Sequence, residues 1–459
     1  MKRYENLVVG GGMAGLPLAL RAARHGSTAF VERERLGGTC LNRGCIPTKT
    51  MIASASLAHR IGRASEFGIE VGPATVDLGA VVDRKDTLVE SIRAGSYRAV
   101  EKASDLDFYE GHGTFLRGRR MKVGDEVIVA DRIFLNTGTR DAVSDIEGLD
   151  AVPHLTSRTI LDLRLLPEHL VVVGGGFVGC EMAQMFSRFG AHVTIVQRGP
   201  RLLESEDPEA SEVVETAFRL EGIDVLTDTA CVAVEPTDQG VRVHCRGAEN
   251  TFIVASHLLV AAGRTPNSDE LGLEHLEVAT DSVGYVPVDD RLRTSADGVW
   301  ALGDLRGGPM FTHTARHDAD VIIGNLFRGV DSSIAGRVVP HAVFVDPEVA
   351  SVGLTEDEAK AAGYPVTVGR QEFRGVAKAR AIGETDGFVK IIADSVSGML
   401  LGCHIVGPDA GNLIHEAVIA MVASAPATVL RDAIHVHPTL AESVNAAAGG
   451  VHRPAAADD

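Results

Sequence analysis

Two cysteines stand five positions apart in the segment GGTCLNRGCIPTK, residues 37–49. Cys40 and Cys45 could hold a metal ion, form a structural crosslink, or open and close as a redox disulfide. A zinc site needs about four ligands, usually in two close pairs, and the sequence has no second Cys or His pair at such spacing near these two residues. A structural disulfide would close only a small loop and is unusual in a reducing compartment. The pattern therefore favours redox chemistry without a bound metal.

Redox chemistry between these cysteines places a demand on the backbone. Five residues on an ideal α-helix turn through about 500° and rise about 7.5 Å, so the two side chains would point apart. Gly44 and Pro47 offer the means to bend the segment, and Pro47 suits the first turn of a helix continuing over residues 48–60. A thiol beside a helix N-terminus has its thiolate favoured, and Lys49 adds a nearby positive charge.

The chain also contains one internal repeat, residues 6–33 and 169–198. Each copy has the pattern of a buried strand, a glycine turn, an amphipathic helix and a second strand, which is the βαβ unit of a dinucleotide-binding fold. The glycines would let the backbone approach a pyrophosphate at the positive end of the helix. Two generic glycine turns are the alternative, but the same context occurring twice argues against it. The motif glycines are Gly10, Gly12 and Gly15 in the first copy and Gly174, Gly176 and Gly179 in the second.

The residue that ends the second strand distinguishes the two copies. In the first copy it is Glu32, whose carboxylate can accept hydrogen bonds from a ribose with a free 2′-hydroxyl, as in FAD and NADH. In the second copy Gln197 stands there, followed by Arg198. That position carries no carboxylate to repel a 2′-phosphate, and a guanidinium is available to bind one. We therefore expect NADPH at the second site, with NADH possible.

A disulfide alone cannot take a hydride from a nicotinamide, but a flavin can accept it and pass both electrons to sulfur. Two dinucleotide sites and one reactive disulfide thus predict an electron relay. The relay would run from NAD(P)H through FAD to the Cys40–Cys45 pair and on to an external substrate.

Length and charge limit the alternatives. The chain has 459 residues, which suits two to four domains. Its net charge of −18 argues against sequence-independent nucleic-acid binding. No signal peptide is visible, and the longest apolar stretch, residues 169–186, contains four glycines and Glu181, so we expect no membrane span. Six cysteines over this length are not a disulfide framework. The expected location is the cytoplasm.

The remaining segments differ in the secondary structure that their sequence patterns predict. Residues 51–68 are helix-like, and short β-like runs are expected from there to about residue 145. Residues 223–262 again alternate as strands. From about Pro340 the pattern predicts an α+β domain with an antiparallel sheet. The last residues, GGVHRPAAADD, are expected to be loose.

These motifs strongly resemble the pyridine-nucleotide-disulfide oxidoreductases, the flavoprotein family of glutathione reductase, dihydrolipoyl dehydrogenase and mercuric reductase. The resemblance covers essentially the whole chain and favours the mercuric-reductase-like and dihydrolipoyl-dehydrogenase-like branch. GGTCLNRGCIPTK resembles the redox-disulfide signature, and VWALGDLRGG resembles the second FAD segment. LNTGTR and AAGRTPN resemble the segments that link the FAD and NAD domains, and HVHPTLAESVN resembles the C-terminal active-site motif.

The resemblance implies a fold class: α/β, with two Rossmann-like dinucleotide-binding domains plus an α+β C-terminal dimerisation domain with an antiparallel sheet. It also implies a homodimer. The expected FAD-binding domain comprises residues 1–145 and 270–338, and the NAD(P)-binding domain residues 146–269. The expected dimerisation domain spans residues 339–450, and residues 451–459 are expected to form a flexible tail.

Residue roles follow from the same resemblance. Cys40 would exchange with substrate, and Cys45 would face the flavin as the charge-transfer thiolate. Lys49 would lie near flavin N5, paired with Glu181. His437, held by Glu442, would be the acid–base in the other subunit's site. The aromatic at the place of Phe177 covers the flavin in glutathione reductase, although core packing is the plainer interpretation. Further residues expected at the cofactors are Gly38, Thr39, Gly138, Gly263 and Asp304.

The other cysteines have no partner at redox spacing, so we expect them to be small buried hydrophobes. They are Cys180, Cys231, Cys245 and Cys403.

The substrate is less defined. The well-known mercuric reductases carry a C-terminal cysteine pair and lack the histidine, whereas this chain has no cysteine after Cys403 and keeps His437. Dihydrolipoyl dehydrogenases share the histidine motif but usually have an acidic residue in place of Gln197. We predict reduction of a small-molecule disulfide or a thiol-bound metal ion. The alternatives are dihydrolipoyl dehydrogenase, mycothione reductase and a flavin-bound sensor protein without turnover. The 2-oxopropyl-coenzyme M type is disfavoured because it lacks the His–Glu pair, and the complete set of catalytic residue types disfavours the sensor.

Overall fold

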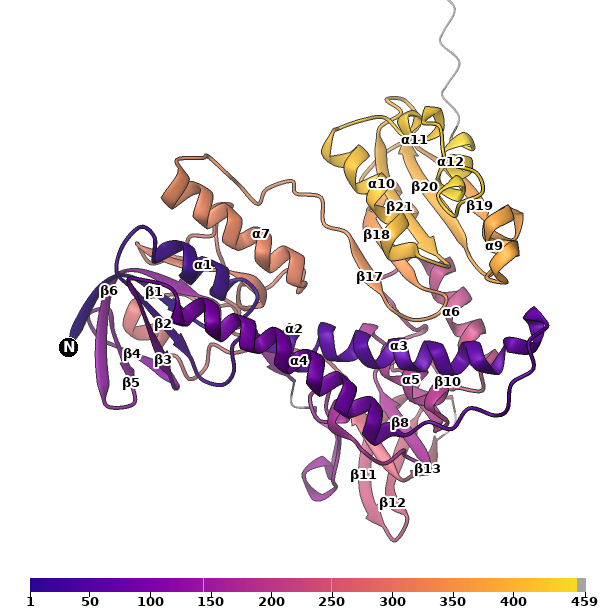
Figure 1. Cartoon of the computed structure of the whole chain (residues 1–459), viewed down its shortest axis with the longest axis horizontal. Helices are drawn as coiled ribbons and strands as arrows, with labels where there is room; N and C mark the ends of the chain where they lie inside the picture. The colour runs from indigo at the N-terminus through magenta and orange to yellow at the C-terminus, as the bar shows by residue number, and fades with distance from the viewer. Residues whose placement is uncertain (143, 249, 452–459) are drawn as a thin grey trace, which may run out of the picture.

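The computed structural model describes residues 1–142, 144–248 and 250–451, so the last eight residues of the expected tail lie outside the described part. Within these ranges the strands form sheets of seven, five, four, three and two members, arranged with the helices as Figure 1 shows. The predicted fold class, α/β with an antiparallel C-terminal sheet, is confirmed.

The first sheet has the strand order β3-β2-β1-β6-β5-β4, with β16 paired to β6. Its centre is parallel, and strand β1 alternates between the two faces. Leu7 and Val9 enter one core, while Val8 packs in another core with helices α1 (Gly15–Ala22) and α7 (Thr312–Ile323). The strands are β1 (Lys2–Val9), β2 (Thr28–Glu32), β3 (Leu106–Glu110), β4 (Gly113–Leu116), β5 (Arg120–Val123), β6 (Glu126–Leu135) and β16 (Val299–Ala301).

The second βαβ unit builds a four-stranded parallel sheet of order β10-β9-β8-β14. Its strands are near-continuous buried runs, as expected for parallel strands covered on both faces. A three-stranded antiparallel sheet, β11-β12-β13, lies between β10 and β14 in the chain. The strands are β8 (His169–Val173), β9 (His192–Val196), β10 (Asp224–Leu226), β11 (Ala230–Thr237), β12 (Gly240–Arg246), β13 (Asn250–Ala255) and β14 (His257–Val260).

Two short strands join these regions. β7 (Thr139–Asp141) and β15 (Arg264–Pro266) pair antiparallel, so the two chain crossings between the first and second sheets run side by side. They come from LNTGTR and AAGRTPN, the segments expected to link the two dinucleotide units.

The C-terminal region is a five-stranded antiparallel sheet of order β17-β18-β21-β20-β19. Figure 1 shows it at the upper right, with α10, α11 and α12 around it. Its elements are β17 (His341–Val343), β18 (Val349–Gly353), α8 (Glu356–Ala361), β19 (Val366–Glu372), α9 (Ala377–Ile382), β20 (Phe388–Asp394), β21 (Leu400–Val406), α10 (Ala410–Val422), α11 (Thr428–Asp432) and α12 (Glu442–Gly449).

The two long helices, α3 and α4, lie between the sheet that contains β1 and the sheet that contains β8 (Figure 1). Helix α3 packs against α4 and α5, and its Met51 and Ala55 share one core with Phe186 of α5. The α-helices of these two regions are α1 (Gly15–Ala22), α2 (Gly38–Arg43), α3 (Cys45–Gly62), α4 (Leu78–Glu101), α5 (Phe177–Phe189), α6 (Pro208–Leu220) and α7 (Thr312–Ile323). Among the described residues, none of the helices is both long enough and apolar enough for a membrane span.

Helix α4 corrects one expectation. We expected short β-like runs after residue 68, but α4 is a helix of 24 residues. Its buried positions Leu78, Val82, Lys85 and Val89 recur at helical spacing, and Asp77 caps its N-terminus by accepting from Ala80 N. The rest of its surface is largely polar, which hid that period among charged residues.

Candidate active site

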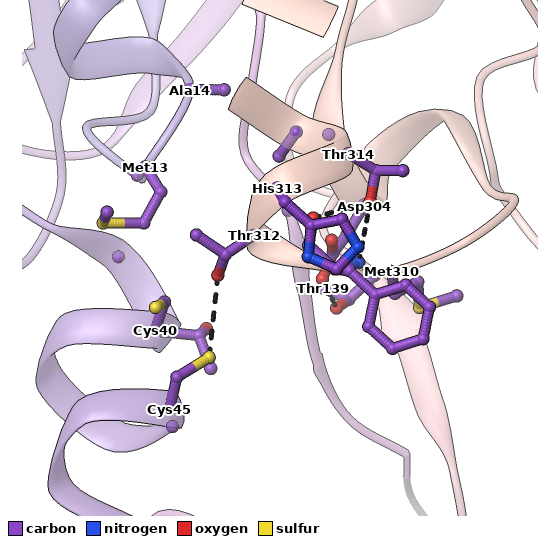
Figure 2. Close-up of a pocket in the computed structure, with 18 of the residues that line it drawn as sticks. Met13, Ala14, Cys40, Cys45, Thr139, Asp304, Met310, Thr312, His313 and Thr314 are labelled. Carbon is purple, nitrogen blue, oxygen red and sulfur yellow. Dashed lines mark hydrogen bonds between the residues drawn. The ribbon is translucent and has the colours of Figure 1, made fainter. Parts of the chain in front are cut away.

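The bend between the two cysteines lies at Gly44. Helix α2 carries Cys40 and ends at Arg43, Gly44 has φ −138° and ψ −116°, and α3 begins with Cys45. A Cβ on Gly44 would lie 3.0 Å from the carbonyl oxygen of Thr39, so a larger residue would push the two turns apart. Pro47 is in the first turn of α3, as predicted. The break brings the two sulfurs to one side of the segment, where both are free thiols (Figure 2).

The two thiols differ in charge. The hydrogen bond from Cys40 lowers the pKa of Cys45 to about 6, with further contributions from the Thr312 hydroxyl and the charge of Lys49. The Thr312 Oγ1 lies 3.6 Å from the Cys45 Sγ (Figure 2). The same hydrogen bond between the sulfurs, together with burial, raises the pKa of Cys40. These shifts favour the thiolate at Cys45 and the thiol at Cys40.

The predicted pair Lys49–Glu181 is present. Lys49 Nζ donates to both carboxylate oxygens of Glu181, at 2.8 and 2.7 Å. Glu181 is buried in α5 and also accepts from the backbone N–H of Phe344 at 3.0 Å. The Lys49 ammonium lies 4.4 Å from the centre of the Phe344 ring. This pair ties α3 to α5 and places a fixed cation one helical turn beyond Cys45.

A cavity of about 1260 Å³ joins these groups to the first glycine turn. This exceeds the usual volume for a drug-sized ligand, roughly 300–1,000 Å³, and suits a dinucleotide. Predicted residues that line it are Gly10, Gly12, Glu32, Gly38, Thr39, Cys40, Cys45, Lys49, Gly138, Phe177, Glu181 and Asp304. Those that lie outside it are Gly15, Gly174, Gly176, Gly179, Gln197, Arg198, Gly263, His437 and Glu442.

The first turn fits a dinucleotide. Gly10 has φ +102°, and a Cβ there would lie 2.2 Å from the carbonyl oxygen of Asn136. A Cβ on Gly15 would lie 1.9 Å from the carbonyl oxygen of Gly10, so the turn closes directly onto the start of α1. Glycine is therefore required by the fold at both positions, and the cavity side of the turn is left bare for a pyrophosphate.

Two carboxylates, those of Glu32 and Asp304, line this cavity. Glu32 accepts from Gly11 N at 2.6 Å and Glu34 N at 2.8 Å, which holds its carboxylate beside the turn with lone pairs left for a ribose. Asp304 accepts from the Thr139 hydroxyl at 3.0 Å, and burial raises its pKa. Both residues line the cavity, and their contacts with the ribose and the ribityl chain of FAD stay predictions.

The second turn has the same backbone and a more open surface. A Cβ on Gly179 would lie 1.8 Å from the carbonyl oxygen of Gly174, whereas one on Gly176 would meet nothing within 4 Å in the described part of the chain. Gln197 Oε1 accepts from Gly175 N at 2.8 Å, and Arg198 is exposed.

A carboxylate also lies beside this second site. A Cβ on Gly199, two residues after Gln197, would lie 1.7 Å from Glu204 Oε1. The position of Gln197 itself carries no carboxylate, but the loop brings one near it. The sequence argument for NADPH, based on residues 197 and 198, did not include Glu204.

The predicted pair of His437 and Glu442 is formed, and it lies on the surface of the chain. His437 Nδ1 lies 2.9 Å from Glu442 Oε1, and the other carboxylate oxygen of Glu442 accepts from Thr439 N at 2.9 Å. These contacts lower the pKa of Glu442, with the Thr439 N–H contributing most. The His437 side chain is 71% exposed. His435 instead pairs with Glu416 at 2.9 Å, which suits a neighbour rather than a catalyst.

No local sequence motif pointed to several of the residues that line the site. Thr312, Phe311 and His341 line the cavity from α7 and the five-stranded sheet, more than 250 residues from Cys45 in the sequence. Only their place in the fold brings them to the cysteines.

The other cysteines lie apart from this site. Cys180, Cys245 and Cys403 are buried, and burial raises the pKa of each thiol, as expected for inert apolar packing. Cys231 is only partly buried and stands directly opposite Cys245 across β11 and β12, a pairing that sequence spacing did not indicate. Across the described residues, no cluster of three or more His, Cys, Asp or Glu side chains is arranged to hold a metal ion.

Comparison with known families defines the class. Residues 4–319 match the family described as pyridine nucleotide-disulphide oxidoreductase, and residues 339–448 match the dimerisation domain of that family. The chain belongs to the pyridine nucleotide-disulphide oxidoreductase family. It is accordingly a flavoprotein disulfide oxidoreductase whose cofactors are FAD and NAD(P)H.

Its relatives fall into more than one activity group. The dihydrolipoyl dehydrogenase of Bacillus subtilis is 33% identical over 97% of each chain. The mercuric reductase of Streptomyces lividans is 36% identical over 97% of this chain and 95% of its own. A solved structure described as the Cu(II) complex of the HOCl-induced flavoprotein disulfide reductase RclA from Escherichia coli superposes with a TM-score of 0.90 at 30% identity, covering 98% of this chain and 100% of that chain.

Proposed function

We propose that this chain is an FAD-dependent NAD(P)H oxidoreductase that reduces a small-molecule disulfide, or a thiol-bound metal ion, through Cys40 and Cys45. The observation that carries the proposal is geometric: the break at Gly44 brings the free thiols of Cys40 and Cys45 to one side of the segment, beside the Lys49–Glu181 ion pair. Both lie in one cavity with the first dinucleotide turn. We also propose the division into an FAD domain (1–145 and 270–338), an NAD(P) domain (146–269) and a dimerisation domain (339–450), in a cytoplasmic protein.

The roles follow from the charges. FAD, held by the first turn, Glu32 and Asp304, supplies hydride acceptance from the nicotinamide and delivery of an electron pair to sulfur. The Cys45 thiolate faces the flavin, and the Cys40 thiol exchanges with the substrate. Lys49, fixed by Glu181, places a positive charge beside the thiolate and the flavin ring. Phe177 covers the nicotinamide side of the cavity and has to move when the nucleotide enters.

His437 completes the site of a partner subunit in this proposal. It lies outside the cavity of its own chain and is 71% exposed, while Glu442 orients its ring. Imidazole titrates near neutral pH, and a carboxylate stabilises its charged form, so His437 can protonate a leaving thiolate. Exposed apolar side chains occur on α10, on α11 and in the loop that precedes His437, and such side chains suit a homodimer contact. They are Ile419, Val422, Val429, Ile434 and Val436.

The trans role of His437 has a direct test. A Cys40→Ser chain and a His437→Gln chain should each lose about 10²-fold or more in turnover. Mixing equal amounts of the two after reversible dissociation should restore about a quarter of the wild-type rate, because about half of the dimers are then mixed and each mixed dimer holds one intact site of two. Restoration of no activity in verified mixed dimers would place His437 in its own subunit's site or outside the mechanism.

The substrate class is tested with a panel. Lipoamide, glutathione disulfide, mycothiol disulfide, Hg²⁺ and Cu²⁺ should each be assayed with NADPH and with NADH, using Cys40→Ser as the control. The metal ions belong in the panel because some relatives are mercuric reductases and one solved relative is a Cu(II) complex. We expect Cys40-dependent reduction of a disulfide or a metal ion.

Two alternatives remain open in the same panel. Activity confined to lipoamide with NAD⁺/NADH would instead support dihydrolipoyl dehydrogenase, the activity of several relatives. Activity confined to mycothiol disulfide would support mycothione reductase. Turnover that persists in Cys40→Ser would contradict the proposed role of the cysteine pair.

A further inference from the structure

Three nearly parallel rings, those of Phe177, Phe311 and His341, meet in the lining of the cavity. The ring centre of Phe177 lies 5.6 Å from that of His341, with 21° between the planes, and 6.3 Å from that of Phe311, with 18°. Phe311 and His341 are 5.5 Å apart and tilted by only 4°. Phe177 comes from the second glycine turn, whereas His341 begins β17 of the dimerisation domain. The position of Phe177 therefore depends on rings from two other parts of the chain.

His341 is itself fixed by a buried carboxylate. Its Nε2 lies 2.7 Å from Glu206 Oε1, and because a carboxylate only accepts, that nitrogen carries the proton. The other oxygen of Glu206 accepts from the Ser351 hydroxyl at 2.6 Å, and Glu206 is 2% exposed. Ser351 stands directly opposite His341 across β17 and β18, so two neighbours on one face of the sheet hold the same carboxylate.

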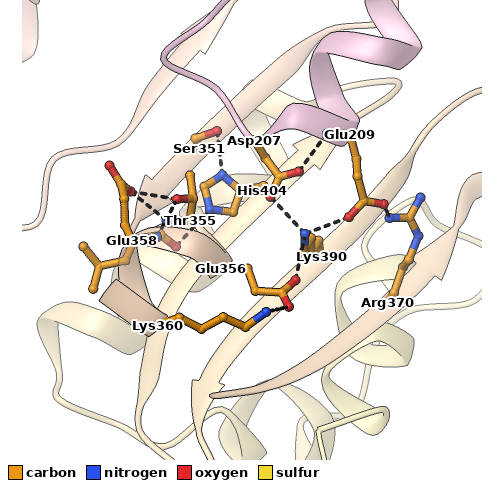
Figure 3. Close-up of polar contacts among 11 residues, drawn as sticks. Asp207, Glu209, Ser351, Thr355, Glu356, Glu358, Lys360, Arg370, Lys390 and His404 are labelled. Atoms are coloured by element: carbon orange, nitrogen blue, oxygen red, sulfur yellow. Dashed lines mark hydrogen bonds and ion pairs between the residues drawn. The ribbon is translucent and has the colours of Figure 1, made fainter. Parts of the chain in front are cut away.

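This contact crosses from the dimerisation domain to the nucleotide-binding unit. Glu206 ends the loop that follows Gln197 and immediately precedes Asp207, the N-cap of α6. Beside it, Lys390 binds Asp207 at 3.0 Å and Glu209 at 2.7 Å, and Arg370 also pairs with Glu209 (Figure 3). These contacts fix the start of α6 against the sheet. His341 is the member of this interface that also lines the cavity.

We infer that His341, fixed by Glu206, is a positioning residue that holds the Phe177 ring closed, so that a contact from the dimerisation domain opposes entry of the pyridine nucleotide. The inference rests on the proposed gating role of Phe177. Opening the gate breaks the ring contacts that stabilise the closed state. A contact made only in the closed state shifts the closed–open equilibrium toward the closed state. It therefore raises the apparent Kd of the nucleotide, by up to the factor by which it shifts that equilibrium.

The test measures nucleotide affinity rather than turnover. Isothermal titration of the oxidised, FAD-loaded enzyme with NADP⁺ and with NAD⁺ gives a Kd that no hydride transfer affects. His341→Gln keeps an N–H for Glu206 but removes the ring. Loss of one aromatic contact should lower the Kd by about two- to tenfold. His341→Ala, which removes both, should lower it at least as much if it folds.

Two controls separate a ring contact from general loosening. In a Phe177→Ala background, His341→Gln should change the Kd by less than about twofold, because the ring it acts on is absent. Arg370→Gln breaks an ion pair at the same domain boundary without touching the rings, and should leave the Kd within about twofold of wild type. The melting temperature of each variant reports whether the domain interface itself has weakened.

The outcomes distinguish this inference from the proposed gate. If Phe177→Ala binds nucleotide no more tightly than wild type, the gate itself is wrong. If Phe177→Ala binds more tightly but neither His341 variant does, the gate stands and the role of His341 is overturned. An equal effect of His341→Gln with and without Phe177, or an equal effect of Arg370→Gln, also overturns it. Tightening by His341→Gln that vanishes without Phe177 supports it.

Discussion

The glycine turn at residues 10–15 and the turn at residues 174–179 solve the same backbone problem. In both, a Cβ on the third glycine would lie within 2 Å of the first glycine's carbonyl oxygen, at 1.9 and 1.8 Å. In both, the side chain at the end of the second strand accepts from the N–H that follows the first motif glycine: Glu32 from Gly11 N at 2.6 Å, and Gln197 from Gly175 N at 2.8 Å. The repeat in the sequence therefore reflects a shared steric requirement.

The two turns differ in what covers them. Gly38 packs onto the first turn so closely that a Cβ would lie 2.7 Å from the Gly12 Cα, and the cysteine-bearing helices close the cavity. Gly176 of the second turn is exposed, and a Cβ there would meet nothing within 4 Å among the described residues. An enclosed site suits a resident cofactor, and an open one suits a nucleotide that binds and leaves each cycle. We therefore expect burial around the turn, and not the turn itself, to separate the two proposed cofactor sites.

The largest effect should come from the cysteines, which belong to the first site alone. Cys40→Ser and Cys45→Ser should each lower disulfide-reducing turnover by at least ~10³-fold. With either sulfur missing, the pair can neither form its disulfide nor pass an electron pair to the substrate. Binding of NADP⁺ at the second site should change by less than about twofold. Steady-state kinetics and titration calorimetry measure the two quantities. A matching loss of nucleotide affinity would contradict the independence of the sites.

Matched glycine substitutions should separate the two turns next. Gly15→Ala should yield protein depleted of flavin, since its methyl group would overlap the Gly10 carbonyl. Gly179→Ala should retain flavin and weaken nucleotide binding by at least ~10-fold. Gly62→Ala is the control, because a Cβ there meets nothing within 4 Å in the described chain. Flavin absorbance per chain and nucleotide Kd are the measurements. Flavin loss in both variants would show that the turns are not separable.

A single added carboxylate should then change the nucleotide preference of the second site, because it gives position 197 the charge that Glu32 has in the first site. Gln197→Glu keeps the acceptor for Gly175 N but adds a negative charge, so the Kd ratio of NADPH to NADH should rise by about tenfold. Glu204→Gln should move the ratio a few-fold in the opposite direction, because that carboxylate lies beside Gly199. An unchanged ratio in both variants would mean that neither residue faces the 2′ position.

The smallest effect concerns the pH dependence of Cys45. Its pKa is lowered to about 6, so the thiolate should form as pH rises through about 6 and be lost below it. Lys49→Met removes a nearby positive charge and should raise that midpoint by up to ~1 unit. The alkylation rate of Cys45 in the reduced enzyme, followed by mass spectrometry against pH, reports the midpoint. A midpoint that does not move would exclude Lys49 as a source of the shift.

Local patterns were sufficient for part of the site. The break at Gly44, the helical start near Pro47 and the proximity of Lys49 to Cys45 all lie within ten residues, where chain geometry alone limits the outcome. The two glycine turns were likewise readable from a short motif. Helix α4 was missed although its buried positions recur at helical spacing, because a mostly polar surface dilutes that signal.

Long-range contacts could not be predicted in the same way. The opposition of Cys231 and Cys245 depends on the register of β11 and β12, which spacing along the chain does not specify. Glu204 reaches the second nucleotide site only through the path of its loop. Such contacts arise from how separately formed elements pack, and each element's own sequence is compatible with many packings.

The sequence by itself determined the chemistry: two cysteines, two dinucleotide turns and a cation beside one sulfur, since these depend on residue types at short spacing. The tertiary structure decided how that chemistry is divided. It placed Thr312 against Cys45, enclosed one turn while leaving the other open, and set His341 against Phe177. The reason is physical: burial and the direction of a hydrogen bond depend on neighbours hundreds of residues away, which only the packed chain supplies.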